Sequence, residues 1–124
     1  MSFHPTLLLI GGSTDLKRFI PLFSQAGFSI LTAERLDEAL AVAHKTRVQG
    51  IIFIVPVYWE PITRFVENVR EIKGYSEMEV PMFYLGKLIE GEDQRILQRY
   101  GVHTVTLGPV PDSELARYIT NKIQ

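Results

Sequence analysis

Apolar and polar positions along the chain follow two alternating periodicities. Five short runs are largely apolar, which is typical of strands buried on both faces of a parallel sheet. They occupy residues 6–10, 29–33, 51–55, 80–86 and 102–107. After each run, apolar side chains recur every three or four residues, as in amphipathic helices. The pattern therefore predicts five strands that alternate with five helices.

The helical stretches also predict which side chains face the core and where each helix begins and ends. Thr14 or Asp15 is expected to cap the first helix, and Pro21 to kink it or delay its start. Gly74 is expected to end the third helix, and Asp112 or Ser113 to cap the last one. The predicted inward residues are Leu16, Phe19, Ile20 and Phe23; Leu36, Ala39, Leu40 and Ala43; Ile62, Phe65, Val66 and Val69; Ile96 and Leu97; and Leu115, Tyr118 and Ile119.

Strands that alternate with helices favour a parallel sheet covered on both faces by right-handed crossovers. The length of 124 residues is that of one domain, so we expect residues 1–124 to form a single (βα)5 unit. The run at residues 51–55 is the most apolar, and we place it at the centre of the sheet.

Composition excludes several function classes. The 13 basic and 14 acidic residues nearly cancel and form no cluster, which argues against nucleic-acid binding. The chain has no cysteine, so it has no disulfide and no thiolate nucleophile. No stretch approaches the roughly 20 apolar residues that span a bilayer, and the first residues lack the pattern of a signal peptide. We therefore expect a soluble, cytoplasmic protein that does not contact a membrane.

Several short motifs share one register with a known family. Leu7–Leu16, Leu36–Leu40, Val80–Leu85, Tyr100–Val102 and Gly108–Val110 stand where response-regulator receiver domains carry similar segments. Across essentially its whole length the chain resembles these CheY-like domains. The resemblance implies a flavodoxin-like three-layer α/β/α sandwich with a five-stranded parallel sheet in the order 2-1-3-4-5.

The positions that carry the receiver family's chemistry depart from its pattern. The two acids that hold magnesium in receivers match Gly11 and Gly12, and the phosphoacceptor aspartate matches Val55. The switch serine or threonine matches Gly86, and the lysine matches Gly108. A hard cation needs oxygen ligands, and phosphoryl transfer needs that cation and a positive side chain. The resemblance thus implies a degenerate pseudo-receiver that is not phosphorylated and is not an enzyme, with no metal and no cofactor. Of the nearest acids, Asp15 is expected to cap a helix and Glu60 to face solvent. Neither is expected to bind a cation.

We therefore predict a phosphorylation-independent protein-interaction module in bacterial signal transduction. Its partner would be a signalling protein or an output domain, and a homodimer is a further expectation. Tyr58 and Trp59 are candidate contact residues because aromatic side chains anchor interfaces, although one ring could instead fill the space left by the missing carboxylates. The resemblance adds Arg95, Arg99 and Arg117 on the last two helices, whose ordinary role is to face solvent.

A second hypothesis concerns the segment from Gly11 to Thr14, between the first strand and the first helix. Open α/β sheets bind ligands at this edge, and the backbone N–H groups of Gly12, Ser13 and Thr14 could hold a phosphate or nucleotide. The segment matches neither a P-loop nor a dinucleotide-binding fingerprint. The three histidines have no metal-ligand spacing, and no catalytic triad can be assembled from the chain.

Overall fold

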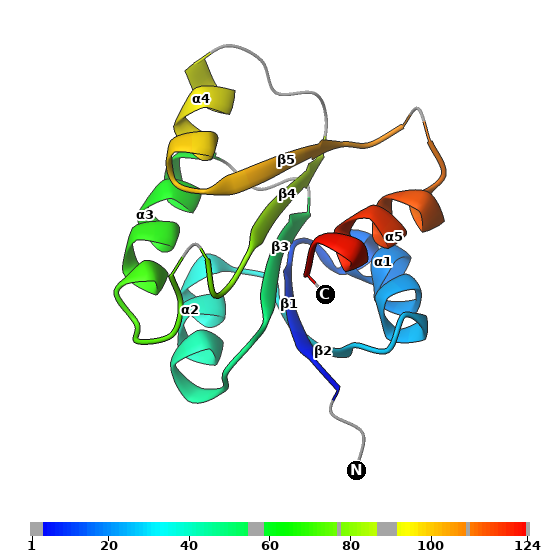
Figure 1. Ribbon diagram of the computed structural model, residues 1–124, viewed down its shortest axis with the longest axis horizontal. Helices are drawn as coiled ribbons and strands as arrows, with labels where there is room; N and C mark the ends of the chain where they lie inside the picture. The colour runs from blue at the N-terminus through cyan, green and yellow to red at the C-terminus, as the bar shows by residue number, and fades with distance from the viewer. Residues whose placement is uncertain (1–3, 55–58, 77, 87–91, 109, 124) are drawn as a thin grey trace.

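The chain forms one parallel sheet with the strand order β2-β1-β3-β4-β5 (Figure 1). The computed structural model describes residues 4–54, 59–76, 78–86, 92–108 and 110–123. The strands are β1 (Thr6–Ile10), β2 (Ser29–Ala33), β3 (Gly50–Ile54), β4 (Met82–Gly86) and β5 (Val102–Thr106). The helices are α1 (Ser13–Gln25), α2 (Leu36–Lys45), α3 (Trp59–Arg70), α4 (Glu92–Arg99) and α5 (Asp112–Ile123). The predicted fold class, strand order and central strand are confirmed.

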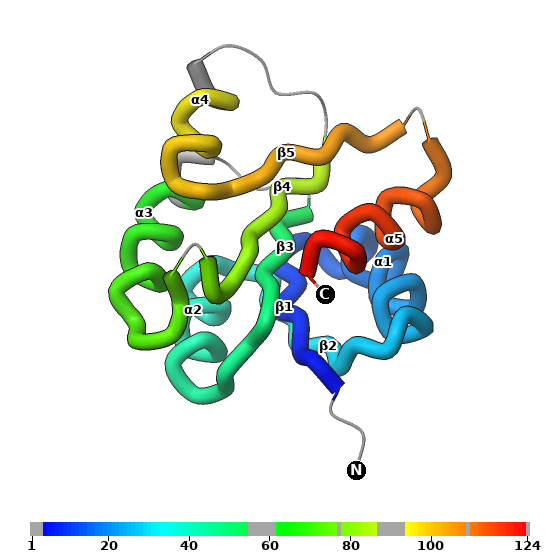
Figure 2. The backbone as a smooth tube through the Cα atoms, in the orientation of Figure 1, coloured from blue at the N-terminus to red at the C-terminus, as the bar shows by residue number. Residues whose placement is uncertain are grey.

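Helices cover both faces of the sheet. Figures 1 and 2 show α1 and α5 together on one face and α2, α3 and α4 on the other. Along β1, Leu8 and Ile10 pack into the core beneath α2 and α3, whereas Leu7 and Leu9 pack beneath α1 and α5. These four side chains are at most 1% exposed. The alternation of a strand thus supplies two separate apolar cores from one run of residues.

The start of α1 differs from the prediction. The helix begins at Ser13 and Gly12 is its N-cap, so Thr14 and Asp15 lie inside the first turn and neither caps the helix. The expectation of a late start is also wrong, because the helix runs through Pro21 to Gln25. β1 ends at Ile10 and α1 begins at Ser13, so Gly12 takes the N-cap position that was predicted for Thr14 or Asp15.

Most predicted inward residues are buried, but Ile20, Leu36 and Leu40 are half-buried. The inward stripe of α3 is confirmed in full, and Leu97, Leu115 and Ile119 are also buried. Ile96 is half-buried. Tyr118, in contrast, is 50% exposed, so its assignment to the core is wrong. Residue 118 faces the open side of α5 beside β5, where no further helix covers it within the described residues.

Three other boundaries shift. β3 ends at Ile54, and Val55 lies outside the described residues. β4 begins after Pro81, which has no N–H to donate to a neighbouring strand. α3 ends at Arg70, and Gly74 lies in the turn that follows, with a φ of +89° that favours glycine. Gly74 therefore shapes the turn rather than the helix end.

Tyr75 connects two loops at the amino-terminal edge of the sheet. Its hydroxyl accepts a hydrogen bond from the Val48 N–H (3.0 Å) and donates one to the Thr46 carbonyl (2.9 Å). The guanidinium of Arg47 lies over the ring, 5.4 Å from its centroid. On the other side of the turn, Arg70 Nη1 donates to the carbonyls of Tyr75, Ser76 and Val80. One buried phenol thus holds the α2–β3 loop against the α3–β4 loop.

Tyr75→Phe is expected to reduce the free energy of unfolding by about 1–3 kcal/mol, because the buried Val48 N–H and the partly buried Thr46 carbonyl lose their partner. Chemical denaturation measures the change. Tyr118→Phe is the matched control, and its exposed position predicts a change within about 0.5 kcal/mol. Equal losses in the two variants would contradict the role given to the Tyr75 hydroxyl.

An ion pair joins α1 to α5. Arg18 donates from Nε to Asp112 Oδ2 (2.5 Å) and from Nη2 to Asp112 Oδ1 (2.7 Å). The hydrogen bond from Arg18 lowers the pKa of the Asp112 carboxyl below its ordinary value of 3.8. Asp112 was predicted as a helix cap, but its carboxylate serves this pair instead. The pair is partly exposed, so its contribution to stability is modest.

Asp112→Asn is expected to cost less than about 1 kcal/mol of stability at pH 7. Because the pKa of Asp112 is lowered by folding, its contribution is present above about pH 4 and is lost as the pH falls through the folded value. The stabilities of wild type and variant should therefore converge in acid when followed by thermal unfolding. A difference that stays constant down to pH 2 would show that the carboxylate charge is not responsible.

Candidate functional site at the carboxyl edge of the sheet

The carboxyl ends of the parallel strands meet at one edge, where open α/β folds bind their ligands. Four glycines that were predicted to replace the receiver family's functional residues lie here. Gly11 and Gly12 follow β1, Gly86 ends β4, and Gly108 follows β5. Val55 would complete the set but lies outside the described residues. The backbone at these glycines determines what the site can hold.

Gly11 lies in the tightest contact of the site. Its N–H donates to the Ala33 carbonyl of β2 (3.0 Å), which fixes its position beside the sheet. A Cβ placed on Gly11 would lie 2.8 Å from the carbonyl oxygen of Ile54 at the end of β3. Real Cβ atoms do not approach backbone oxygens so closely, so any larger residue must push β1 and β3 apart. The position expected to carry a carboxylate in a receiver therefore has no space for one.

Gly12 is different, because it has room and an ordinary backbone conformation. Its φ of −68° and ψ of 156° suit any residue. The nearest atom to a Cβ placed there would be Asp15 Oδ2, at 3.9 Å. Its carbonyl accepts the Leu16 N–H and so closes the first turn of α1 (2.9 Å). A carboxylate side chain would therefore fit at position 12, whereas position 11 has no space for one.

Gly86 and Gly108 close the other side of the site. Gly86 is buried, and its carbonyl accepts the N–H of Leu107 (2.7 Å), which extends the pairing of β4 with β5. Gly108 has a φ of +120°, a conformation that residues with a Cβ rarely adopt. A lysine at this position would strain the backbone. Of these four glycines, Gly11 and Gly108 therefore have backbone geometry that only glycine fits well.

Among the side chains that the structure describes, the other candidate ligands form no cation site. Within the described residues, no group of three or more His, Asp or Glu side chains could hold a metal ion. Asp15 is half-buried in the first turn of α1. The side chains of Glu60 and Trp59 lie outside the described residues, although both residues belong to α3. Tyr58 also lies outside them, so its predicted role as a partner contact is untested.

The segment proposed to bind an anion keeps its geometry but carries a negative charge. Ser13 and Thr14 are exposed at the start of α1, next to Gly12. Asp15 belongs to the same turn and already places a carboxylate at the positive end of the helix dipole. A phosphate would be repelled by this charge, so the ligand-binding hypothesis receives no added support from the structure.

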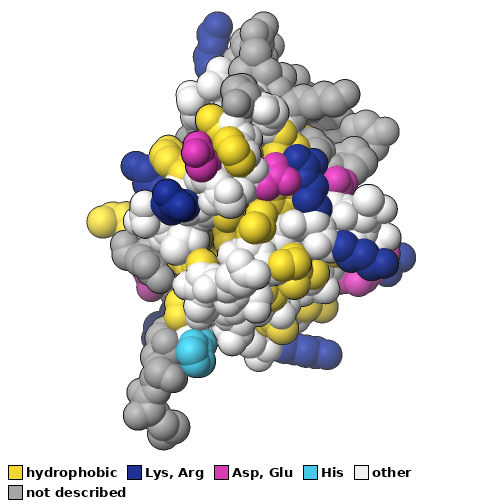
Figure 3. All heavy atoms as spheres, turned by 90° about the vertical axis from the view of Figure 1, so that its right-hand side faces the viewer, with side chains coloured by type: hydrophobic (Ala, Val, Ile, Leu, Met, Phe, Trp, Pro, Cys, Tyr) yellow, Lys and Arg dark blue, Asp and Glu magenta, His cyan; other side chains and the backbone are white. Residues whose placement is uncertain are grey.

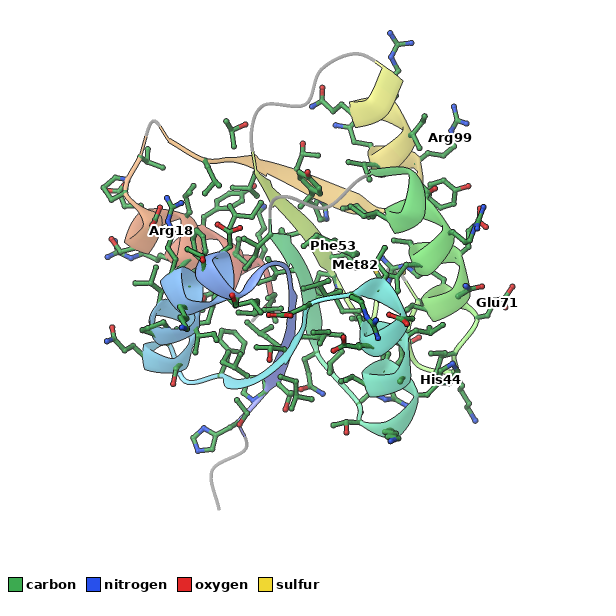
Figure 4. All side chains as sticks on the ribbon, turned by 180° about the vertical axis from the view of Figure 1, so that it is seen from behind. Arg18, His44, Phe53, Glu71, Met82 and Arg99 are labelled. Carbon is green, nitrogen blue, oxygen red and sulfur yellow. The ribbon has the colours of Figure 1, made fainter. Side chains whose placement is uncertain are left out.

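The three candidate arginines lie in two different layers. Arg95 and Arg99 are exposed on α4, whereas Arg117 is exposed on α5. Arg117 lines a groove of about 250 Å³ between α1 and α5, together with Leu22 and Gln25. Figure 3 shows this α1–α5 side of the molecule, where apolar side chains emerge between acidic and basic ones. Figure 4 shows Arg99 on the outer side of α4, far from Arg18 on α1.

A second groove was not predicted from the sequence. It has a volume of about 410 Å³ and lies between β5 and α5, where Val105 and Leu115 meet Val110 and Tyr118. The periodicity of α5 predicts that Tyr118 lies in the core, so this groove cannot be predicted from that pattern. One signal in the sequence was available, since β5 is the last strand in the predicted order and must therefore have a free edge.

Comparison with known proteins identifies the fold. No protein-family model matches the sequence, and a search of curated protein sequences finds no match. Among solved structures, the chemotaxis protein CheY4 of Vibrio cholerae has a TM-score of 0.81 at 20% identity, over 98% of this chain and 100% of that one. The orphan response regulator HP1043 of H. pylori has a TM-score of 0.77 at 13% identity, over 97% of each chain.

A third similar structure is the CheY-like protein TadZ of Pseudomonas aeruginosa, with a TM-score of 0.73 at 16% identity over 98% of this chain and 100% of that one. The fold is therefore that of CheY-like receiver domains, as the sequence motifs predicted. Within the described residues, no helix has the length and apolar character needed to cross a membrane.

Gly11→Asp is expected to reduce the free energy of unfolding by about 1–3 kcal/mol, because the new side chain has no space beside Ile54. Gly12→Asp is the matched control, and we expect a smaller loss, within about 1 kcal/mol, because aspartate is accepted at an N-cap although it lies near the Asp15 carboxylate. Denaturant titration of both variants measures the difference. Equal stability of the two variants would show that β1 and β3 can separate at little cost.

Proposed function

We propose that this chain is a receiver-like domain in signal transduction that binds a protein partner without being phosphorylated. The observation that carries the proposal is the close approach of Gly11 to Ile54. The positive φ of Gly108 supports it independently, because a lysine is strained in that conformation. Together they support the proposal, because backbone suited to glycine stands at two positions that the sequence motifs align with a receiver's carboxylate and lysine.

The chemistry of phosphoryl transfer explains why these positions matter. The developing charge on the transferred group requires a divalent cation and a positive side chain in position. Magnesium demands several oxygen ligands in near-octahedral geometry. Gly11, Gly12 and Gly86 offer carbonyl oxygens only, and those of Gly12 and Gly86 already accept backbone hydrogen bonds. A domain of this kind regulates by the surface that it presents, not by a covalent modification in the pocket.

The surfaces available for a partner are those around the helices. Arg95 and Arg99 on α4 and Arg117 on α5 are exposed and could pair with acidic groups of another protein. Because they lie in different layers, we propose that they serve separate contacts and do not form one patch. Substitution by alanine, one layer at a time, separates the two contributions once a partner is in hand.

The test is an amide NMR titration with magnesium, followed by beryllofluoride, which mimics a phosphoryl group on aspartate. We expect no change of chemical shift at Gly11, Gly12, Gly86 or Gly108, because the pocket offers neither the ligands nor the nucleophile. A phosphorylatable receiver domain titrated in parallel is the control that the reagent is active. Saturable shifts confined to these glycines would overturn the proposal.

A further inference from the structure

Thr120 on α5 carries a buried hydroxyl without a hydrogen-bond partner. The residue is 8% exposed, and its Oγ1 has no partner among the residues that the structure describes. A threonine in a helix can donate to the carbonyl one turn earlier, which here belongs to Ala116. Thr120 does not make that bond. Because an unpaired buried hydroxyl lowers stability, its presence requires a physical explanation.

The same residue lines the groove between α1 and α5, on the side of the molecule that Figure 3 shows. The groove has a volume of about 250 Å³, so it suits a molecule smaller than a typical drug. Leu22 and Ala26 line it from α1, and Ala116 lines it from α5. The two alanines carry only methyl groups, so they leave space between the helices. The result is a short apolar floor next to a buried hydroxyl.

The Arg18–Asp112 ion pair crosses from α1 to α5 at one end of this groove. Arg18 precedes Leu22 by about one turn of α1, and Asp112 precedes Ala116 by about one turn of α5. The pair therefore joins the helices just before the apolar floor begins. An extended polypeptide could not follow the groove without passing over this pair. A small molecule fits the closed end better.

Arg117 gives the groove a positive charge. It lines the groove and is exposed, and within the described parts of the chain no ion pair engages its guanidinium. Arg117 and Thr120 are three residues apart, so they are neighbours on one helix face, about 4.5 Å apart along the axis. A guanidinium and a hydroxyl at this spacing can donate to the two oxygens of one carboxylate.

We propose that the α1–α5 groove binds a small aliphatic carboxylate. Its carboxylate accepts hydrogen bonds from Arg117 and from the hydroxyl of Thr120, and its chain covers Leu22, Ala26 and Ala116. Threonine has two common rotamers in a helix, so a turn about χ1 can direct the hydroxyl at the ligand. The bound acid then gives Thr120 the partner that the chain itself does not supply. Burial of the apolar floor adds to the affinity.

An acidic side chain of a partner protein offers the same chemical group to Arg117. A titration of this chain alone with hexanoate tests the free acid, because no partner protein is present. We expect saturable NMR shifts of the amides of Leu22, Ala26, Ala116 and Thr120, in the millimolar range that so small a ligand allows. Hexan-1-ol and hexylamine are the matched control ligands, since they keep the chain and lose or reverse the charge. Both should bind at least tenfold more weakly.

Charge removal at two arginines tests the first contact. Arg117→Gln should weaken hexanoate at least tenfold, because a charge-assisted hydrogen bond is lost. Arg95→Gln is the matched control: Arg95 is equally exposed but lies on α4, in the other layer. Hexanoate should bind this variant as it binds the wild type. Equal weakening in both variants would show a general effect of net charge and would overturn the assignment.

The second contact predicts opposite effects on stability and on binding. Thr120→Val keeps the shape of the side chain and removes the unpaired hydroxyl, so its denaturation midpoint should rise. The same variant should bind hexanoate at least fivefold more weakly. Thr120→Ser retains the hydroxyl and should bind as the wild type does. A hydroxyl with a purely structural role would give a lower midpoint for Thr120→Val and unchanged binding.

Absence of saturable shifts with hexanoate overturns the inference, as do shifts that hexan-1-ol reproduces at equal concentration. A lower midpoint for Thr120→Val overturns the role given to its hydroxyl. If Thr120→Val fails to fold, Thr120→Ser and Arg117→Gln still decide the question. None of these outcomes bears on the beryllofluoride titration, because the groove and the glycine site are separate parts of the molecule.

Discussion

The rest of the structure depends on the burial of β1 and β3 on both faces. Leu7 to Ile10 and Ile51 to Ile54 are almost wholly removed from solvent, so neither face of these strands can be left uncovered. Helices must therefore pack on both sides, and parallel strands can be joined only by crossovers long enough to supply them. With both faces occupied, the ends and edges of the sheet are the only parts of it that remain available for contact with another molecule.

At the carboxyl ends, the same packing decides what chemistry the protein can support. β1 and β3 approach so closely that Gly11 touches the backbone of Ile54. Replacement of an acid by glycine can be a simple loss of a functional group, which a reverse substitution would restore. At Gly11 the backbone leaves no space for a side chain, so an acid there would also require the strands to part. Gly12 has that space, so the two neighbouring glycines differ in how much rearrangement an acidic substitution would need.

The fold could be predicted from the sequence because its strands are continuous apolar runs and its helices have clear stripes. Parallel strands buried on both faces give the strongest signal that a single sequence carries. For the site, the sequence predicts only which receiver side chains are not found in this chain, at Gly11, Gly12, Gly86 and Gly108. Their backbone conformations depend on how neighbouring strands pack, which no local pattern records.

The errors have similar causes. Tyr118 follows the inward period of α5 but lies beside the edge strand, where no helix in the described part of the chain covers it. Thr14 and Asp15 are good capping residues, yet the turn after β1 is so short that Gly12 takes that place. Each error concerns the relation between elements rather than the elements themselves.

The unequal number of partners per strand also bears on how the native state opens. β1 pairs with both β2 and β3, whereas β5 pairs with β4 alone. Separation of β5 breaks a single ladder, but release of β1 requires the whole centre of the sheet to come apart. Amide protons in β1 and β3 should thus exchange with solvent only through global unfolding, while those of β5 exchange through a smaller, local opening. β5, like β2, is held by a single ladder and can open locally, whereas β1 and β3 each have two partners.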